Sequence, residues 1–180
     1  MNLIITAFLL TLSVLLLSYF AYRKAFFSPR ANRTAIAATE GPQFEPHRDA
    51  MRRIFVQLAQ RPYEDVTITS HDGLTLYGRY YHIQDGAPLG IAFHGYRSCP
   101  LADFSVVIPY YHSLGFNLLL ADQRSHGKSE GNYITFGIRE HEDAQMWIDF
   151  HNQNFGELPV FLGGMSMGAT TVLMAAGREL

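Results

Sequence analysis

The first pattern along the chain is an apolar run without any charged residue from Leu3 to Tyr22, "LIITAFLLTLSVLLLSYFAY". At about 1.5 Å of rise per residue, a helix of this length crosses a hydrocarbon core of roughly 30 Å. Apolar side chains surround the whole circumference and leave no polar face, which is untypical of a helix in a soluble domain. The run therefore predicts a transmembrane helix, and a cleaved signal peptide is the alternative.

The charges around this run favour an anchor that stays in place. No Lys or Arg precedes it, no clear A-x-A site follows it, and the basic residues come directly after it: Arg23, Lys24, Arg30 and Arg33. Positive charge collects on the cytoplasmic side of a membrane. We therefore assign residues 1–30 to a single-pass anchor with a basic flank and expect a cytoplasmic domain, with an exported domain as the alternative.

The next pattern is a polar linker followed by an amphipathic helix. Residues 31–45 are small and polar with Gly and Pro, which is typical of a linker. Residues 47–60 then place apolar side chains at helical spacing, namely Met51, Ile54, Phe55 and Leu58. Residues 31–60 are thus expected to form a linker and a short lead-in helix.

From residue 61 the apolar period changes to that of strands. "DVTITSHDGLTLYGRYYH" is two alternating runs joined by Asp72-Gly73, which predicts a β-hairpin. Three short apolar runs follow, "LGIAFHG", "NLLLADQR" and "LPVFLGG", each typical of a strand buried on both faces.

Helical spacing separates these strands. Residues 101–115 predict a helix that Pro109 kinks or whose start it shifts, residues 139–156 predict one with acids in its first turn, and a last helix follows Met167. This alternation predicts an α/β domain over residues 61–180, with a mostly parallel sheet and helices on both faces.

Composition excludes several classes of function. The 180 residues are 48% hydrophobic with a net charge of −2, which argues against a disordered tail and gives no basic face for nucleic acid. The single cysteine, Cys99, cannot form an internal disulfide. A metalloenzyme is a weak option, because His141-Glu142 is followed by Gln145 where the zinc motif needs histidine. We expect no metal and no cofactor.

The candidate nucleophile is Ser166 in Gly164-x-Ser166-x-Gly168, between a predicted strand and a predicted helix. A serine at such a sharp turn is strained and exposed, and the glycines let the two backbones pass closely. The following helix N-terminus favours negative charge as it develops. A glycine-rich turn with an idle serine is the alternative interpretation.

A second motif, His94-Gly95-Tyr96, ends an earlier strand at the same edge of the predicted sheet. The backbone amides of Tyr96 and Met167 are therefore candidate donors to an oxyanion. His94 could be a general base, but a packing role that holds the loop fits this position better.

A third motif, "DQRSHGKSEG", follows the next strand. With it the sequence resembles the alpha/beta-hydrolase superfamily, many members of which carry Asp-x-Arg-Gly-His-Gly-x-Ser after the fourth strand, H-G-x after the third and G-x-S-x-G after the fifth. All three occur here in that order within residues 63–180. The resemblance implies that Asp122, Arg124 and His126 form a structural network. Ser125 stands where glycine is usual. A serine at position 166 argues against the epoxide hydrolase and dehalogenase branches, which use aspartate there.

The family order is Ser, then Asp or Glu, then His, and the last two are missing. After Ser166 come one carboxylate, Glu179, and no histidine. All eight histidines precede Ser166: 47, 71, 82, 94, 112, 126, 141 and 151. An upstream histidine could substitute, since other folds use other orders. We expect instead the N-terminal part of a longer hydrolase, truncated after the nucleophile strand and helix, with that strand left as an apolar edge.

These observations predict a membrane-anchored serine hydrolase that cleaves an ester, thioester or amide through an acyl-enzyme. Its substrate would be a small-molecule, acyl or peptide compound, and the 180 residues alone would be inactive without a triad acid and histidine. The alternative is a non-catalytic alpha/beta-hydrolase scaffold that binds a partner or an acyl ligand at the membrane.

Overall fold

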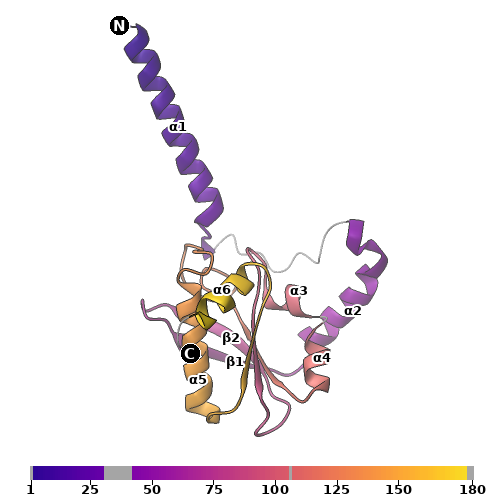
Figure 1. Ribbon diagram of the computed structural model, residues 1–180. Helices are drawn as coiled ribbons and strands as arrows, with labels where there is room; N and C mark the ends of the chain where they lie inside the picture. The colour runs from indigo at the N-terminus through magenta and orange to yellow at the C-terminus, as the bar shows by residue number, and fades with distance from the viewer. Residues whose placement is uncertain (1, 31–41, 106, 178–180) are drawn as a thin grey trace.

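Five strands form one mixed sheet in the order β1-β2-β4-β3-β5 in the computed structural model, which describes residues 2–30, 42–105 and 107–177 (Figure 1). The strands are β1 (Glu64–Thr69), β2 (Thr75–Tyr81), β3 (Leu89–Phe93), β4 (Asn117–Ala121) and β5 (Val160–Gly164). β1 and β2 form the predicted hairpin and β2 runs antiparallel to β4, whereas β4, β3 and β5 are parallel to one another. This confirms the predicted α/β class.

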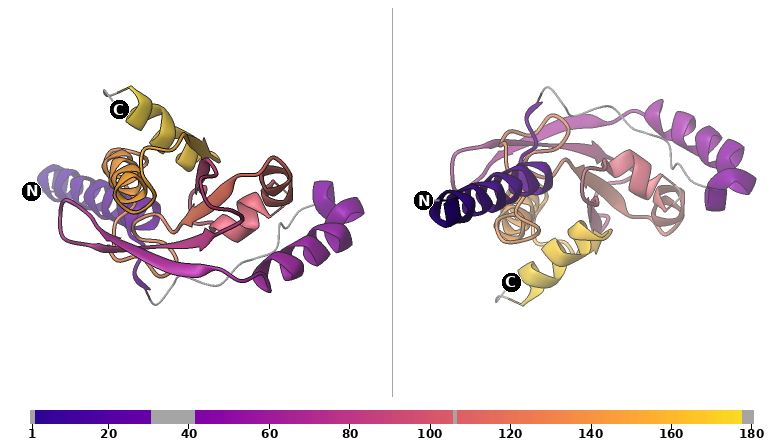
Figure 2. Two further views of the ribbon diagram at one scale, coloured as in Figure 1. Left: turned by 90° about the horizontal axis from the view of Figure 1, so that it is seen from below. Right: turned by 90° about the horizontal axis from the view of Figure 1, so that it is seen from above.

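Helices cover both faces of the sheet, as predicted (Figure 2). The helices are α1 (Asn2–Phe26), the 3-10 helix η2 (Pro42–His47), α2 (Arg48–Ala59), α3 (Pro100–Phe104), α4 (Ile108–Ser113), α5 (Glu140–Phe155) and α6 (Met167–Ala176). On one face Trp147 of α5 and Ala175 of α6 are buried against the strands. On the other face Leu58 of α2, Leu101 of α3 and Ile108 of α4 fill the second core.

The N-terminal helix α1 has 25 residues and no buried side chain. The mean hydropathy of its apolar window is 2.4, so it is long and apolar enough to cross a membrane. By length and composition a signal sequence passes the same test.

Three details differ from the sequence-based predictions. The predicted helix over residues 101–115 is two short helices, because Pro109 lies in the first turn of α4, where its missing N–H is no loss. The two strands of the hairpin were predicted to be joined by Asp72-Gly73, but their connection spans residues 70–74, and within it only Gly73 has a positive φ (83°). Residues 31–41 of the predicted linker lie outside the described residues, and 42–47 form η2 instead.

The run of β5 was predicted to be typical of a strand buried on both faces, yet to be left as an apolar edge of the sheet. In the described chain the edge position is confirmed and burial on both faces is wrong. The strand lies at the edge of the sheet and pairs with β3, and Phe161 is 48% exposed. Strands β3 and β4, which lie between neighbours, are buried along their whole length. The apolar sequence of β5 is thus that of an interior strand at a position where its outer edge is open.

Candidate active site

The carboxyl ends of the three parallel strands lie level with one another. Phe93 of β3 pairs in register with Ala121 of β4 and with Gly164 of β5. The three sequence motifs follow these residues directly, so they meet at one edge of the sheet. In open α/β sheets this edge is where ligands bind.

Ser166 lies between β5 and α6 in a backbone conformation that non-glycine residues rarely adopt, with φ 51° and ψ −112°. Such conformations cost about 1–3 kcal/mol and persist only where the surrounding structure imposes them. A hydrogen bond from the Met165 amide to the Phe93 carbonyl (3.0 Å) ties the turn to β3. The side chain of Ser166 is exposed, so the strained turn presents the hydroxyl to the outside.

The two glycines that flank the serine are required by close backbone contacts. A Cβ on Gly164 would lie 2.2 Å from the carbonyl oxygen of Gly168. A Cβ on Gly168 would lie 1.8 Å from the carbonyl oxygen of Phe93. Since neither neighbour is a flexible side chain, any larger residue would force the backbone apart. The G-x-S-x-G spacing therefore has a steric cause in this structure.

The loop after β3 lies directly against this turn. A Cβ on Gly95 would be 3.6 Å from Cβ of Ser166, and the Gly95 amide donates to Oδ2 of Asp103 (2.6 Å). Asp103 also accepts from the hydroxyl of Ser98 (2.7 Å), which holds the loop from its other side. The next residue, Tyr96, is therefore fixed beside the nucleophile turn.

The candidate oxyanion donors are the amides of Tyr96 and Met167. Among the described residues, the backbone hydrogen bonds outside helices and strands include none donated by either amide. Met167 is the first residue of α6, where the amides point out of the helix and favour negative charge. The assignment of these two amides stays a prediction.

His94 is a buried strut between two loops. It is 0% exposed, and its Nε2 accepts from the Gln123 amide (3.2 Å), so Nδ1 carries the proton and donates to the Gly95 carbonyl (2.8 Å). Burial and, to a smaller extent, the neighbouring His126 together lower the pKa of His94 to about 3, against an opposing effect of the hydrogen bond to Gly95. Because its lone pair is already occupied, His94 cannot take a proton from Ser166.

His126 connects the same loops in a similar way. Its Nε2 accepts from the Arg97 amide (3.0 Å), and its Nδ1 therefore donates to the Arg124 carbonyl (2.9 Å). The rings of His94 and His126 meet edge to face at 4.6 Å between centroids. Both histidines thus fix the loops around the site as neutral groups.

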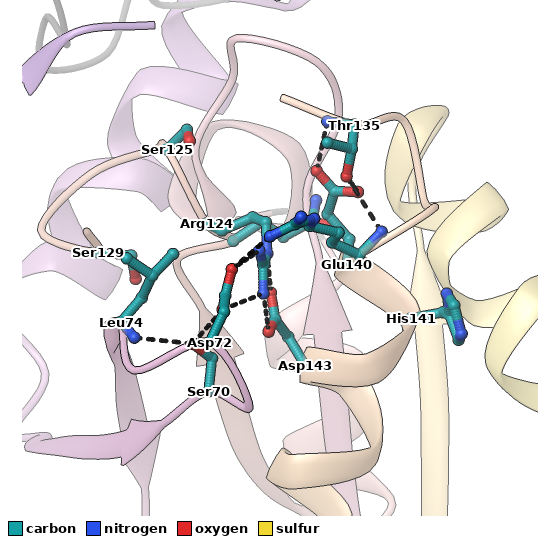
Figure 3. Close-up of polar contacts among 12 residues, drawn as sticks. Ser70, Asp72, Leu74, Arg124, Ser125, Ser129, Thr135, Glu140, His141 and Asp143 are labelled. Carbon is teal, nitrogen blue, oxygen red and sulfur yellow. Dashed lines mark hydrogen bonds and ion pairs between the residues drawn. The ribbon is translucent and has the colours of Figure 1, made fainter. Parts of the chain in front are cut away.

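Arg124 is the centre of a buried ion-pair network (Figure 3). It donates two hydrogen bonds to Asp143 of α5 (2.6 Å each) and two to Asp72 of the hairpin loop (3.0 and 3.2 Å). Asp72 also accepts from Arg139 (2.7 Å). The hydrogen bond from Arg124 holds the pKa of Asp72 well below its usual range, against an opposing effect of burial. The network joins the hairpin, the loop after β4 and the start of α5.

Asp122 and Ser125 of this motif are also tied to backbone groups. Asp122 accepts from the Lys128 amide (2.9 Å), and burial raises the pKa of its carboxyl group. Ser125, which stands where the family has glycine, has φ 63° and is fully buried. Its hydroxyl donates to the Tyr133 carbonyl (2.8 Å), an interaction that offsets part of the cost of the left-handed backbone.

No histidine is placed to activate the serine within residues 2–30, 42–105 and 107–177, where no hydrogen bond joins Ser166 to an imidazole. His141 is buried on α5, its Nδ1 donates to the Gly137 carbonyl (2.9 Å), and its Nε2 has no hydrogen-bond partner in the described chain. The carboxylate Glu179 lies outside the described residues. A complete triad is therefore not found in this part of the chain.

A strained serine turn over a β5–α6 junction, beside an H-G loop and a D-x-R-x-H-G loop on one sheet edge, is the arrangement of one superfamily. Solved structures with this fold match the chain. An esterase of Pyrococcus furiosus, Pf2001, matches with a TM-score of 0.58 and 28% identity, covering 79% of this chain and 52% of its own. The chain belongs to the alpha/beta-hydrolase superfamily.

Further comparisons agree with this alpha/beta-hydrolase assignment. The alpha/beta hydrolase GrgF of a Penicillium species matches with a TM-score of 0.61 and 25% identity, over 66% of this chain and 42% of GrgF. The family model described as serine aminopeptidase, S33, matches residues 91–179. An uncharacterized Bacillus subtilis protein, YqkD, is 33% identical over 76 residues, which are 40% of this chain and 25% of YqkD. The chain spans about half the length of the esterase and less of the others.

Three contributors to this alpha/beta-hydrolase edge were not singled out from the sequence. Glu140 is buried and accepts from the Thr135 and Gly137 amides (2.8 Å each), where it fixes the loop before α5 (Figure 3). Arg97 and Phe136 join the edge to α1. Acids in the first turn were the signal for Glu140, whereas nothing in the local sequence marks the other two.

Proposed function

We propose that this chain carries the nucleophile and the oxyanion hole of a serine hydrolase that cleaves an ester, thioester or amide. The observation that carries the proposal is the strained, exposed turn of Ser166 against the Gly95 loop, with both flanking glycines required sterically. An idle serine would not need a conformation that costs about 1–3 kcal/mol. The match to a serine aminopeptidase model and to an esterase supports the same reaction class.

In the proposed mechanism, Oγ of Ser166 attacks the carbonyl carbon of the substrate and loses its proton to a histidine. The Tyr96 and Met167 amides donate to the oxyanion of the tetrahedral intermediate. The intermediate collapses to an acyl-enzyme as the leaving group takes the proton from the histidine. Water, deprotonated by the same histidine, then releases the acid and restores the serine.

We propose that the histidine and its carboxylate partner belong to residues of the full-length protein beyond Leu180. No histidine follows Ser166 in the sequence, and His94 and His126 have their lone pairs occupied by backbone amides. The chain spans about half of the P. furiosus esterase, and β5 leaves an open apolar edge. Both observations fit a sheet that continues past β5.

Labelling with a fluorophosphonate tests the enzyme assignment. The full-length protein should be labelled, Ser166→Ala should abolish the label, and Ser113→Ala on the exposed surface of α4 should retain it. The 180-residue chain alone should label weakly, since its serine lacks a base. Absence of label in the full-length protein would instead support the alternative, a non-catalytic scaffold, and a label that persists in Ser166→Ala would place the nucleophile elsewhere.

We also propose that α1 is a retained membrane anchor and that the domain lies in the cytoplasm. The support is the basic residues Arg23, Lys24 and Arg30 directly after the apolar run.

A further inference from the structure

The end of α1 is capped by the hydrolase domain. The last carbonyls of a helix have no partner within the helix. Here three of them accept from the domain: Lys24 from the guanidinium of Arg97 (2.7 Å), Ala25 from the hydroxyl of Tyr96 (2.7 Å) and Phe26 from the Ile134 amide (2.8 Å). A cation at this position also interacts favourably with the helix dipole. The C-terminal end of α1 is therefore joined to the domain by hydrogen bonds to its last carbonyl groups.

The segment after α1 continues along the same edge. Phe27 forms an antiparallel bridge with Tyr133, and the Ser28 amide donates to the Asn132 carbonyl (2.8 Å). The buried hydroxyl of Ser28 donates to the Ser125 carbonyl (2.9 Å), so the segment reaches the loop after β4. Residues 24–28 are thus packed on the domain, whereas a flexible flank would make few such bonds.

Aromatic rings extend this connection toward the nucleophile. Phe136 meets Phe26 edge to face at 5.5 Å and stacks on Tyr96 at 5.1 Å between centroids. Tyr96 follows Gly95, which lies against Ser166. Two residues of one loop therefore separate the end of α1 from the serine. Figure 1 shows α1 leaving the domain from the loops at this end of the sheet.

The position of α1 sets the height of this edge relative to a bilayer. The apolar run ends at Tyr22, and Arg23 and Lys24 mark the level of the headgroups. Phe26 lies roughly one helical turn, about 5 Å, beyond that level. With α1 as the membrane anchor proposed above, the contact of Phe26 with this edge would place the edge at the membrane surface.

Apolar side chains are exposed on the same edge. Phe136 is 39% exposed, Ile138 66% and Met165 46%. Gly137, between the first two, approaches Thr170 of α6 so closely that a Cβ would lie 2.9 Å from its methyl carbon. Met165 directly precedes Ser166, Phe136 contacts Phe26 of α1, and the segment of Ile138 approaches α6, so exposed apolar side chains lie both beside the serine turn and beside the end of α1. Contiguous apolar surface beside a membrane-spanning helix is typical of an interface with lipid.

We propose that the edge carrying Ser166 rests on the lipid surface and that the substrate is an amphiphile held in the bilayer by an acyl chain. Its carbonyl reaches Ser166 at the headgroup level while the chain remains among the lipids. The proposal takes its chemistry from the function proposed above, but the orientation of the edge does not depend on catalysis.

Fluorescence quenching tests the orientation. A single cysteine is placed at the apolar rim (Ile138→Cys) or at the opposite end of the sheet (Asp85→Cys), each with Cys99→Ser. Both positions are exposed, so labelling with an environment-sensitive dye should not disturb the fold. The full-length protein is reconstituted in phosphatidylcholine–phosphatidylglycerol vesicles with or without headgroup-labelled nitroxide lipid. We expect several-fold stronger quenching at position 138. Equal quenching at both sites, or a dye at 138 that is buried but not quenched and is therefore covered by protein, would overturn the proposal.

Hydrolysis assays test the substrate class. A long-chain acyl ester in the vesicles is compared with a short-chain soluble ester, using the full-length protein and a variant with twelve Gly and Ser residues inserted after Tyr22. The insertion leaves residues 24–28 on the domain but releases them from the membrane-embedded helix. We expect several-fold slower hydrolysis of the embedded ester and an unchanged rate on the soluble ester. Equal effects on both esters would overturn the proposal, whereas hydrolysis of neither ester by the unaltered protein would refute the proposed function and leave the quenching result to decide the orientation.

Discussion

A methyl group added at Gly168 should break the turn that presents Ser166. The Cβ of Gly168→Ala would lie 1.8 Å from the Phe93 carbonyl oxygen, 2.5 Å from its carbon and 2.9 Å from the His94 carbonyl oxygen. Ordinary contacts begin near 3.4 Å, so β3 and α6 must separate by more than 1 Å. Overpacking against side chains costs about 1–3 kcal/mol, because a side chain can relax into another rotamer. The atoms that would clash here belong to the backbone, which has no such relaxation. We therefore expect a loss of more than about 3 kcal/mol.

The matched control is Gly163→Ala in β5, directly before the motif, because a Cβ there would lie 3.8 Å from its nearest neighbour. Thermal unfolding of the full-length protein, followed by fluorescence of the buried Trp147, reports on the core that α6 and β3 share. At roughly 2–4 °C per kcal/mol for a domain of this size, Gly168→Ala should melt about 10 °C lower, and Gly163→Ala within about 2 °C of the unaltered protein. A Gly168→Ala variant that melts with the control would show that β3 and α6 are not this close, and the argument for a strained nucleophile turn would fail with it.

Two further predictions concern the buried groups around the site. The pKa of His94 is about 3 when folded and near 6.5 when unfolded, so on acidification the unfolded chain binds a proton that the folded chain does not, and stability falls below pH 6.5. Between pH 7 and pH 5 the resulting loss in the free energy of unfolding is about 2 kcal/mol. Urea titrations at the two pH values should therefore show a loss about 2 kcal/mol smaller in His94→Gln than in the unaltered protein. An equal loss in both proteins would contradict the prediction. Arg124→Met leaves Asp143 buried without its partner and should cost about 3–5 kcal/mol, whereas Arg124→Met with Asp143→Leu should recover at least half, as measured by the same titrations. Equal losses in the single and double variants would show that the cost is one of packing rather than of an unpaired charge.

The order of strands and helices could be predicted from the sequence because the apolar residues of each segment have the spacing typical of that strand or helix. β3 and β4 are continuous apolar runs and are buried throughout, as such runs require. The hairpin followed from alternation around Asp72-Gly73. The break between α3 and α4 was harder, because Pro109 is compatible with either a kink or a new start, and only packing against the sheet selects one.

The burial of β5 shows a limit of such reasoning, because its edge position followed only from the expected truncation and not from its own sequence. Its sequence gives the side chains that an interior strand would need, but which strands flank it is a property of the whole sheet. Pairing with β3 on one side was set by the crossover through α5. What lies on the other side is not encoded in the five residues of β5.

The sequence by itself determined the chemistry at the sheet edge: a G-x-S-x-G turn, an H-G loop and a D-x-R-x-H-G loop at strand ends. These are short-range patterns, since each depends on residues within one turn of chain. Tertiary structure decided which residues from other parts of the chain hold these loops in place. His94 and His126 became neutral struts because backbone amides from other loops occupy their lone pairs. Arg97 became the cap of α1, some 70 residues away, because the ends of β3 and of α1 meet in space. Contacts between residues so far apart leave no periodic trace in the sequence, and they are what bring the end of α1 close to Ser166.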